Sequence, residues 1–105
     1  MTKKERLIEM IETEPELLKI IQSKEYMKVL EEINKKPPKI EFLKSNIDFK
    51  NVSILYNILD TLIQTNLIKK ILLDEEEVYY LTDKGQEFVS IYIESKEKFD
   101  LNGGE

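Results

Sequence analysis

Across much of the chain, apolar side chains recur every three or four positions, which is the spacing of one face of an α-helix. In the clearest example, residues 51–66, the apolar positions follow one another at intervals of three, three, one and three residues. These positions are Val52, Leu55, Ile58, Leu59 and Leu62. Polar residues occupy the opposite side. The pattern therefore predicts an amphipathic helix with one side in the core and the other in solvent.

The first 21 residues carry a broader helical pattern. We predict helix over residues 2–21 in two pieces, with Thr2 capping the first piece and Thr13 capping the second ahead of Pro15. The apolar side of this segment is wider than one narrow stripe. Two interpretations stay open: the segment covers part of the domain's own core, or it is a dimerisation arm.

Two further helices are expected between this segment and the long helix. Ser23 is placed to cap a helix that must stop before Pro37-Pro38, since proline cannot continue a helix. Residues 40–46 predict a short helix followed by a turn. Asn51 or Ser53 can then start the long helix. Short helix, turn and longer helix is the helix-turn-helix arrangement.

A hairpin is expected after the long helix. Asn66 tolerates the left-handed conformation in which helices often end. Residues 71–73 and 78–81 are rich in β-branched, aromatic and other apolar side chains and predict two strands. The acidic residues 74–77 separate them, and without glycine they favour no two-residue turn. Thr82 is placed to cap a final helix, from 83 to about Phe99.

This order of elements resembles the winged helix-turn-helix domain of many bacterial and archaeal transcription regulators. The run Tyr80-Leu81-Thr82-Asp83-Lys84-Gly85, followed by Phe88, is similar to the end of the wing in MarR- and PadR-type proteins. The resemblance covers about residues 24–90 and rests on core and cap positions. It implies a mainly α fold with a small β-hairpin (α+β), with extra N-terminal and long C-terminal helices.

The domain organisation follows from this resemblance. We expect one domain overall, made of an N-terminal helical extension (1–22), a winged helix-turn-helix core (23–82), and a C-terminal helix with a frayed tail (83–105). In MarR- and PadR-like proteins the helix that corresponds to the last one packs against a second subunit. The expected assembly is therefore a homodimer formed through the N- and C-terminal helices.

Composition limits the class of protein. The 105 residues are 35% charged and 41% hydrophobic and contain no cysteine and no histidine. No apolar run approaches the roughly 20 residues that span a bilayer, so we expect a cytoplasmic protein without membrane contact. No nucleophile is paired with a base, so we expect no enzyme, and we expect no cofactor or metal. The acidic run 74–77 lacks the ligand spacing of a calcium loop.

Charge is divided unevenly along the chain, whose net charge is -5. Residues 23–50 hold seven lysines and five acids, whereas residues 71–105 hold three lysines and ten acids. A nucleic-acid binder concentrates positive charge on one face, and only the middle of this chain supplies it.

The resemblance implies that the long helix enters the major groove of double-stranded DNA. The candidate contacts are Ser53, Tyr56 and Asn57 for bases or phosphates, and Lys39, Lys44 and Lys50 for phosphates, with Lys35 and Lys36 nearby. The competing interpretation is a solvated polar face. Asp60 puts a carboxylate on this face, and no arginine follows Arg6 in the chain.

Two functions remain open. The first is a dimeric DNA-binding transcription regulator. The second is a winged-helix module that binds another protein and no DNA, because an acidic wing would repel phosphates and suits a basic partner. A third, simpler role for the acids is to prevent the strand edges from aggregating.

Overall fold

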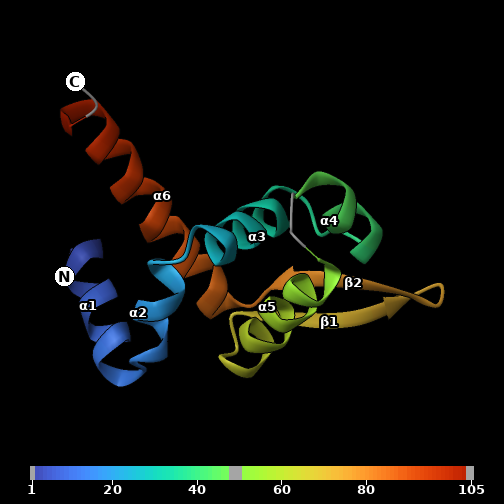
Figure 1. Cartoon of the computed structure of the whole chain (residues 1–105). Helices are drawn as coiled ribbons and strands as arrows, with labels where there is room; N and C mark the ends of the chain where they lie inside the picture. Colours follow the sequence, from blue (N-terminus) through green and yellow to red (C-terminus); the bar gives the residue numbers. More distant parts are fainter. Residues whose placement is uncertain (1, 48–50, 104–105) are drawn as a thin grey trace.

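The computed structural model describes residues 2–47 and 51–103, and the side chains as far as Ser95. The described residues form helices and one two-stranded antiparallel hairpin (Figure 1). The elements in chain order are α1 (Lys3–Thr13), α2 (Glu16–Ile21), α3 (Lys24–Lys35), α4 (Ile40–Asn46), α5 (Val52–Gln64), β1 (Ile68–Leu73), β2 (Glu76–Leu81) and α6 (Asp83–Gly103). This confirms the predicted fold class. The last helix runs further than its expected end near Phe99.

The N-terminal segment is helical in two pieces, but only the first cap is the predicted one. Thr2 forms a capping box, in which its hydroxyl accepts the Glu5 N–H at 3.1 Å. Thr13 does not cap α2. It lies in the last turn of α1, and its hydroxyl donates to the Glu9 carbonyl at 3.0 Å. Since α1 continues through Thr13, α2 begins after Pro15 without a side-chain cap.

The three helices of the helix-turn-helix begin and end where the local pattern indicated. The Ser23 hydroxyl accepts the Tyr26 N–H at 3.3 Å at the start of α3. The Asn51 side chain accepts the Ser53 N–H at 3.0 Å at the start of α5. Between α3 and α4, the Pro38 carbonyl accepts the Tyr79 N–H of β2 at 3.0 Å. The segment that proline keeps out of a helix therefore runs beside the hairpin.

The core confirms most of the apolar stripe of α5. Leu55, Ile58, Leu59 and Leu62 are at most 3% exposed and pack in one cluster with buried side chains of the helices and the hairpin. Val52, which was predicted to face inward, is 47% exposed. It stands in the first turn of α5, where the helix extends past the edge of the core.

The hairpin, referred to below as the wing, is longer and its turn tighter than predicted. Only Asp74 and Glu75 lie between the strands, with φ values of 52° and 67°. Two left-handed residues match a type I′ turn, whose twist suits a hairpin even though glycine is the preferred residue there. The expected four-residue acidic loop is therefore wrong, since Glu76 and Glu77 belong to β2.

The passage from α5 to β1 is held by the start of α6. Asn66 adopts the predicted left-handed conformation, with φ of 63°. The Thr82 hydroxyl donates to the Asn66 carbonyl at 2.6 Å and accepts the Gly85 N–H at 3.0 Å, which confirms it as the cap of α6. The Lys84 ammonium donates to the Thr65 carbonyl at 2.8 Å. Polar groups at the end of α5 thus find partners at the start of α6.

The terminal helices and the wing lie at opposite ends of the molecule. Figure 1 shows α1 and α6 together at one end and the tip of the hairpin extending beyond the helices at the other. Within the part of the chain that the structure describes, no helix is both long and apolar enough to cross a bilayer.

We predict that Gly85→Ala destabilises the fold strongly. A Cβ atom at this position would lie 1.9 Å from the Leu67 carbonyl oxygen, so backbone atoms must move to admit it. The expected loss in unfolding free energy is roughly 2–4 kcal/mol, measured by urea denaturation. Gln86→Ala, on the exposed side of the same helical turn, is the control and should change it by less than about 0.5 kcal/mol. Equal stability of the two variants would contradict this close contact.

Candidate nucleic-acid interface

The solvent side of α5 forms a polar face next to α4. Ser53, Tyr56, Asn57 and Asp60 are exposed on this helix, while the four buried leucine and isoleucine residues hold its opposite side in the core. The Ser53 hydroxyl also lies very close to the Asn51 carboxamide oxygen. Ser53 is therefore part of the cap as well as of the exposed face. The apolar side of α5 is therefore held in the core, and its polar side is exposed to solvent.

Lys44 of α4 joins this face through Tyr56. Its ammonium nitrogen lies 5.6 Å from the centre of the Tyr56 ring, within the range of a cation–π contact. Glu41 lies 3.8 Å away on the same helix. The Tyr56 side chain, followed by the charge of Glu41, raises the pKa of Lys44 above its usual value. This lysine therefore stays charged beside the exposed face of α5.

The other two predicted phosphate contacts are placed differently. Lys39 precedes α4, lies next to β2 through a bridge to Val78, and forms an ion pair with Glu76. The hydrogen bond to Glu76, followed by its charge, raises the pKa of Lys39. Its charge is therefore partly neutralised within the wing. Lys50 lies outside the described residues.

The acids of the wing do not act as one patch. Glu76 pairs with Lys39, and Glu77 lies 3.6 Å from Lys70 of β1. Only Asp74 and Glu75, in the turn itself, form no ion pair among the described residues. The wing is therefore less repulsive to phosphate than its sequence suggested, and the charge that no ion pair offsets is confined to the tip.

Tyr79 connects the wing to α5 and was not among the predicted site residues. Its side chain is buried, and its hydroxyl donates to the Glu77 carboxylate at 3.1 Å. Burial, followed by the hydrogen bond to Glu77, raises the pKa of Tyr79, and the neighbouring Tyr56 and Asp60 add to the shift. The hydroxyl therefore remains a hydrogen-bond donor. Alternation along a strand puts Glu77 and Tyr79 on the same face of the hairpin, and this signal was present in the sequence.

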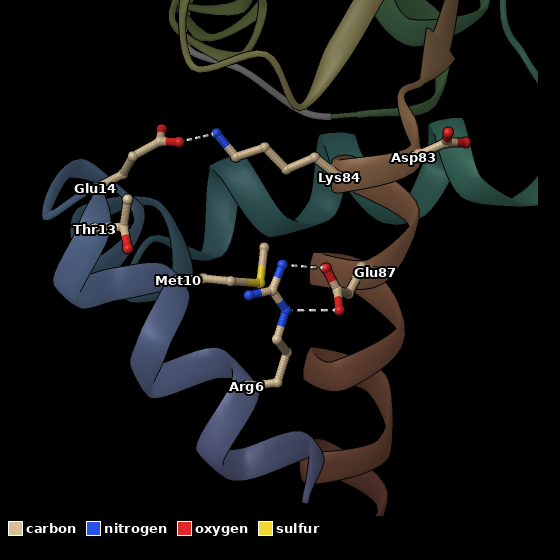
Figure 2. A pocket seen from close by; sticks show the side chains of 7 residues that line it. All are labelled: Arg6, Met10, Thr13, Glu14, Asp83, Lys84 and Glu87. Carbon is tan, nitrogen blue, oxygen red and sulfur yellow. Dashed lines mark hydrogen bonds and ion pairs between the residues drawn. The ribbon is translucent and has the colours of Figure 1, made fainter. Parts of the chain in front are cut away.

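Arg6, the only arginine in the sequence, is far in sequence from the residues of the α5 face. It links the two terminal helices instead. Figure 2 shows its guanidinium facing the Glu87 carboxylate across α1 and α6, with two hydrogen bonds of 2.8 and 3.1 Å. Lys84 pairs with Glu14 in the same region. Lys3 and Glu94 form a further ion pair at 2.6 Å between these two helices.

The Arg6–Glu87 and Lys84–Glu14 pairs line a pocket of about 410 Å³ between α1 and α6 (Figure 2). Its lining residues are Arg6, Met10, Thr13, Glu14, Asp83, Lys84 and Glu87. Arg6 and Lys84 already have carboxylate partners. We therefore interpret these charged residues as a link between two helices. The hydrogen bond from Arg6 lowers the pKa of Glu87, which favours the charged form of the pair.

Comparison by sequence finds nothing: no protein-family model matches the chain, and no curated protein is similar to it. Comparison by structure finds similar folds. The reduced form of the transcriptional regulator YodB from B. subtilis has a TM-score of 0.74 and 16% identity, covering 85% of this chain and 90% of that one.

A second similar structure is archaeal. It was reported as a mechanosensitive channel and is described as a structural homologue of MarR-like transcriptional regulators. It has a TM-score of 0.69 and 15% identity, covering 75% of this chain and 70% of that one. The chain therefore has the winged-helix fold of MarR-like regulators, and neither similar structure is described as an enzyme.

We predict a pH-dependent contribution of the Arg6–Glu87 pair to stability. Because the pKa of Glu87 is lower in the folded state than its usual value of about 4.3, its charged form favours folding above that pH, and this contribution is lost as the pH falls. Glu87→Gln should lower the melting temperature by a few degrees at most at pH 7, since the pair is partly exposed. Below about pH 4 the difference from the unsubstituted protein should narrow.

The control for this experiment is Glu12→Gln, an exposed carboxylate on α1 whose removal leaves the pair intact. Its melting temperature should follow that of the unsubstituted protein across the pH range in differential scanning calorimetry. A Glu87→Gln difference that grew on acidification would contradict the assigned sign.

Proposed function

We propose that the protein is a DNA-binding transcription regulator of the winged-helix type, with α5 in the major groove. The observation that supports this most is the accessible polar face at the N-terminal half of α5, which has Lys44 beside it. A groove-reading helix needs its inner side fixed and its outer side polar, and α5 has both properties. The similar folds of transcriptional regulators support the same function.

Each predicted contact has a role that its chemistry allows. Asn57 can hydrogen-bond to N6 and N7 of adenine, and Tyr56 and Ser53 can contact a base edge or phosphate. Lys44 supplies a positive charge for phosphate next to Tyr56. Lys39 and Lys50 are proposed as further phosphate contacts, with Lys39 exchanging its partner Glu76 for phosphate.

The regulator is proposed to be a cytoplasmic homodimer that uses its N- and C-terminal helices. Ile8 on α1 and Leu18 on α2 are 48% and 44% exposed, which supports an apolar contact at this end of the molecule. YodB is described in a reduced form, whereas these 105 residues contain no cysteine. A response to redox state through thiols of this chain is therefore not part of the proposal.

A second function is supported by the tip of the wing. Asp74 and Glu75 are exposed and form no ion pair among the described residues, so they could contact a basic protein surface. In this alternative the winged helix binds a protein and no DNA. The two functions differ in one measurable property, which is affinity for duplex DNA at low salt.

We predict that the protein binds mixed-sequence duplex DNA with a dissociation constant of roughly micromolar or lower at low salt, and that the affinity falls steeply as salt is added. Lys44→Ala should reduce the slope of log affinity against log salt by about one, because one phosphate contact is lost. Fluorescence anisotropy measures both quantities. Absence of binding at low salt would exclude this function.

Two substitutions on α5 provide a matched comparison. Asn57→Ala should weaken binding to a selected site by about 1–3 kcal/mol, since a base contact is removed. Gln64→Ala, also exposed but at the C-terminal end of the helix, should leave binding unchanged. Equal effects of the two would contradict the proposed orientation of α5.

We predict that the wing tip opposes DNA binding more than the acids on β2 do. The double substitution Asp74→Asn and Glu75→Gln removes two charges that form no ion pair among the described residues, and it should strengthen binding by about threefold to tenfold at low salt, with a smaller gain at high salt. Glu76→Gln is the comparison. It frees Lys39, so any gain would come through that lysine, and Lys39→Ala in the same background should abolish it.

A further inference from the structure

The outer edge of β1 has no partner strand within residues 2–47 and 51–103. The sheet contains β1 and β2, and the described segment that approaches its other side, at Lys39, bridges to β2. Among the described residues, none pairs with the outer edge of β1. Figure 1 shows this part of the hairpin extending past the helices. A free strand edge offers unpaired N–H and C=O groups to another strand.

The hydrogen-bond pattern shows which residues point toward this edge. The Thr82 N–H donates to the Leu67 carbonyl, so Leu67 and every second residue after it direct their backbone groups toward β2. On the far side of β2, the Tyr79 N–H donates to the Pro38 carbonyl. This bond agrees with the alternation, because it shows that Tyr79 directs its backbone groups away from β1. Lys70 and Leu72 therefore direct their N–H and C=O groups toward the free edge.

The side chains along this edge are apolar in the centre and oppositely charged at the two ends. Ile71, Leu72 and Leu73 are 37%, 68% and 48% exposed. Lys69 and Lys70 precede them, and Asp74 and Glu75 follow. Lys69 and Glu75 form no ion pair among the described residues and stand at equal distances in sequence from Leu72.

We propose that this edge pairs with the same edge of a second copy of the chain, antiparallel, with Leu72 on the two-fold axis. Antiparallel pairing of residues 71–73 brings the basic start of each strand near the acidic turn of the other, so that Lys69 approaches Glu75 of the second copy, while Lys70 keeps Glu77 as its partner within its own hairpin. Ile71 then lies opposite Leu73 of the second copy. The register satisfies the outward backbone groups of Leu72 and keeps lysines from facing each other.

A second copy fits this edge better than an unrelated strand because the charge pattern is antisymmetric about its centre. An isologous contact makes each favourable pair twice, once for each copy. The contact is also separate from the proposed dimer of the terminal helices, which lie at the opposite end of the molecule (Figure 1). The two contacts can therefore be tested independently, and DNA is not required for either test.

A single introduced cysteine reports the register directly, because the chain contains no other cysteine. In Leu72→Cys the two sulfur-bearing residues face each other across the axis, at a Cα separation of about 5.5 Å, which suits a disulfide. Under mild oxidation this variant should form covalent dimers on non-reducing gels. Leu73→Cys is the control, since its residues are offset along the strands and should cross-link poorly. Equal cross-linking, or none in Leu72→Cys, would overturn the register.

Charge reversal tests the proposal without a covalent bond. Lys69→Glu and Glu75→Lys should each weaken self-association about tenfold in sedimentation analysis, and an equimolar mixture of the two should restore it, because the mixed pair has opposite charges at both ends. Recovery in the mixture shows that neither variant is misfolded. A protein that stays monomeric at sub-millimolar concentration would overturn the proposal. Self-association that is unchanged by either charge reversal and by Leu72→Lys would also overturn it, because the contact would then lie on another surface.

Discussion

The position of α5 depends on the hydrogen bonds made by the backbone just after its C-terminal end. At the end of that helix the carbonyls of Thr65, Asn66 and Leu67 need partners, and the start of α6 supplies them through the Lys84 ammonium and the Thr82 hydroxyl and N–H. The start of α6 can approach the Leu67 carbonyl this closely because Gly85 has no Cβ atom. The helix α5 with its exposed polar face, the wing and the terminal helix α6 thus meet at one junction.

The same junction connects the two ends of the molecule. Lys84 also pairs with Glu14, which follows α1, and the Arg6–Glu87 pair holds α1 against α6 one turn further along. Movement of the terminal helices would therefore shift the groups that hydrogen-bond to the backbone at the end of α5. This physical link is what a regulator would need for signals at its terminal helices to alter α5, the helix proposed to contact DNA.

Charge in the wing shows how tertiary contacts change the meaning of a sequence pattern. Four adjacent acids suggest a strongly repulsive tip, yet two of them pair with Lys39 and Lys70. What remains without an ion pair among the described residues is the two acids of the turn and Lys69 at the start of β1. This separation lessens the conflict with DNA binding and also creates the charge pattern that favours antiparallel pairing of two wings.

The sequence alone determined the features that depend on neighbouring residues. The stripe of α5, the caps at Thr2 and Ser23, and the left-handed Asn66 follow from contacts within one or two helical turns, and they were sufficient to predict a winged helix. The tertiary structure alone decided the rest. It ended α1 after Thr13, so that residue caps nothing, and it brought Lys44 to Tyr56 across two helices.

The candidate site was accordingly predictable only in part. Ser53, Tyr56 and Asn57 share a face because helical periodicity places them there, and periodicity can be read from the sequence. Lys39 and Lys70 pair with the wing because the strand register and the path of the chain around α4 bring them to it. The Lys39–Glu76 contact joins residues far apart in the chain, and the Lys70–Glu77 contact depends on a strand register that the sequence did not fix, so local spacing predicted neither.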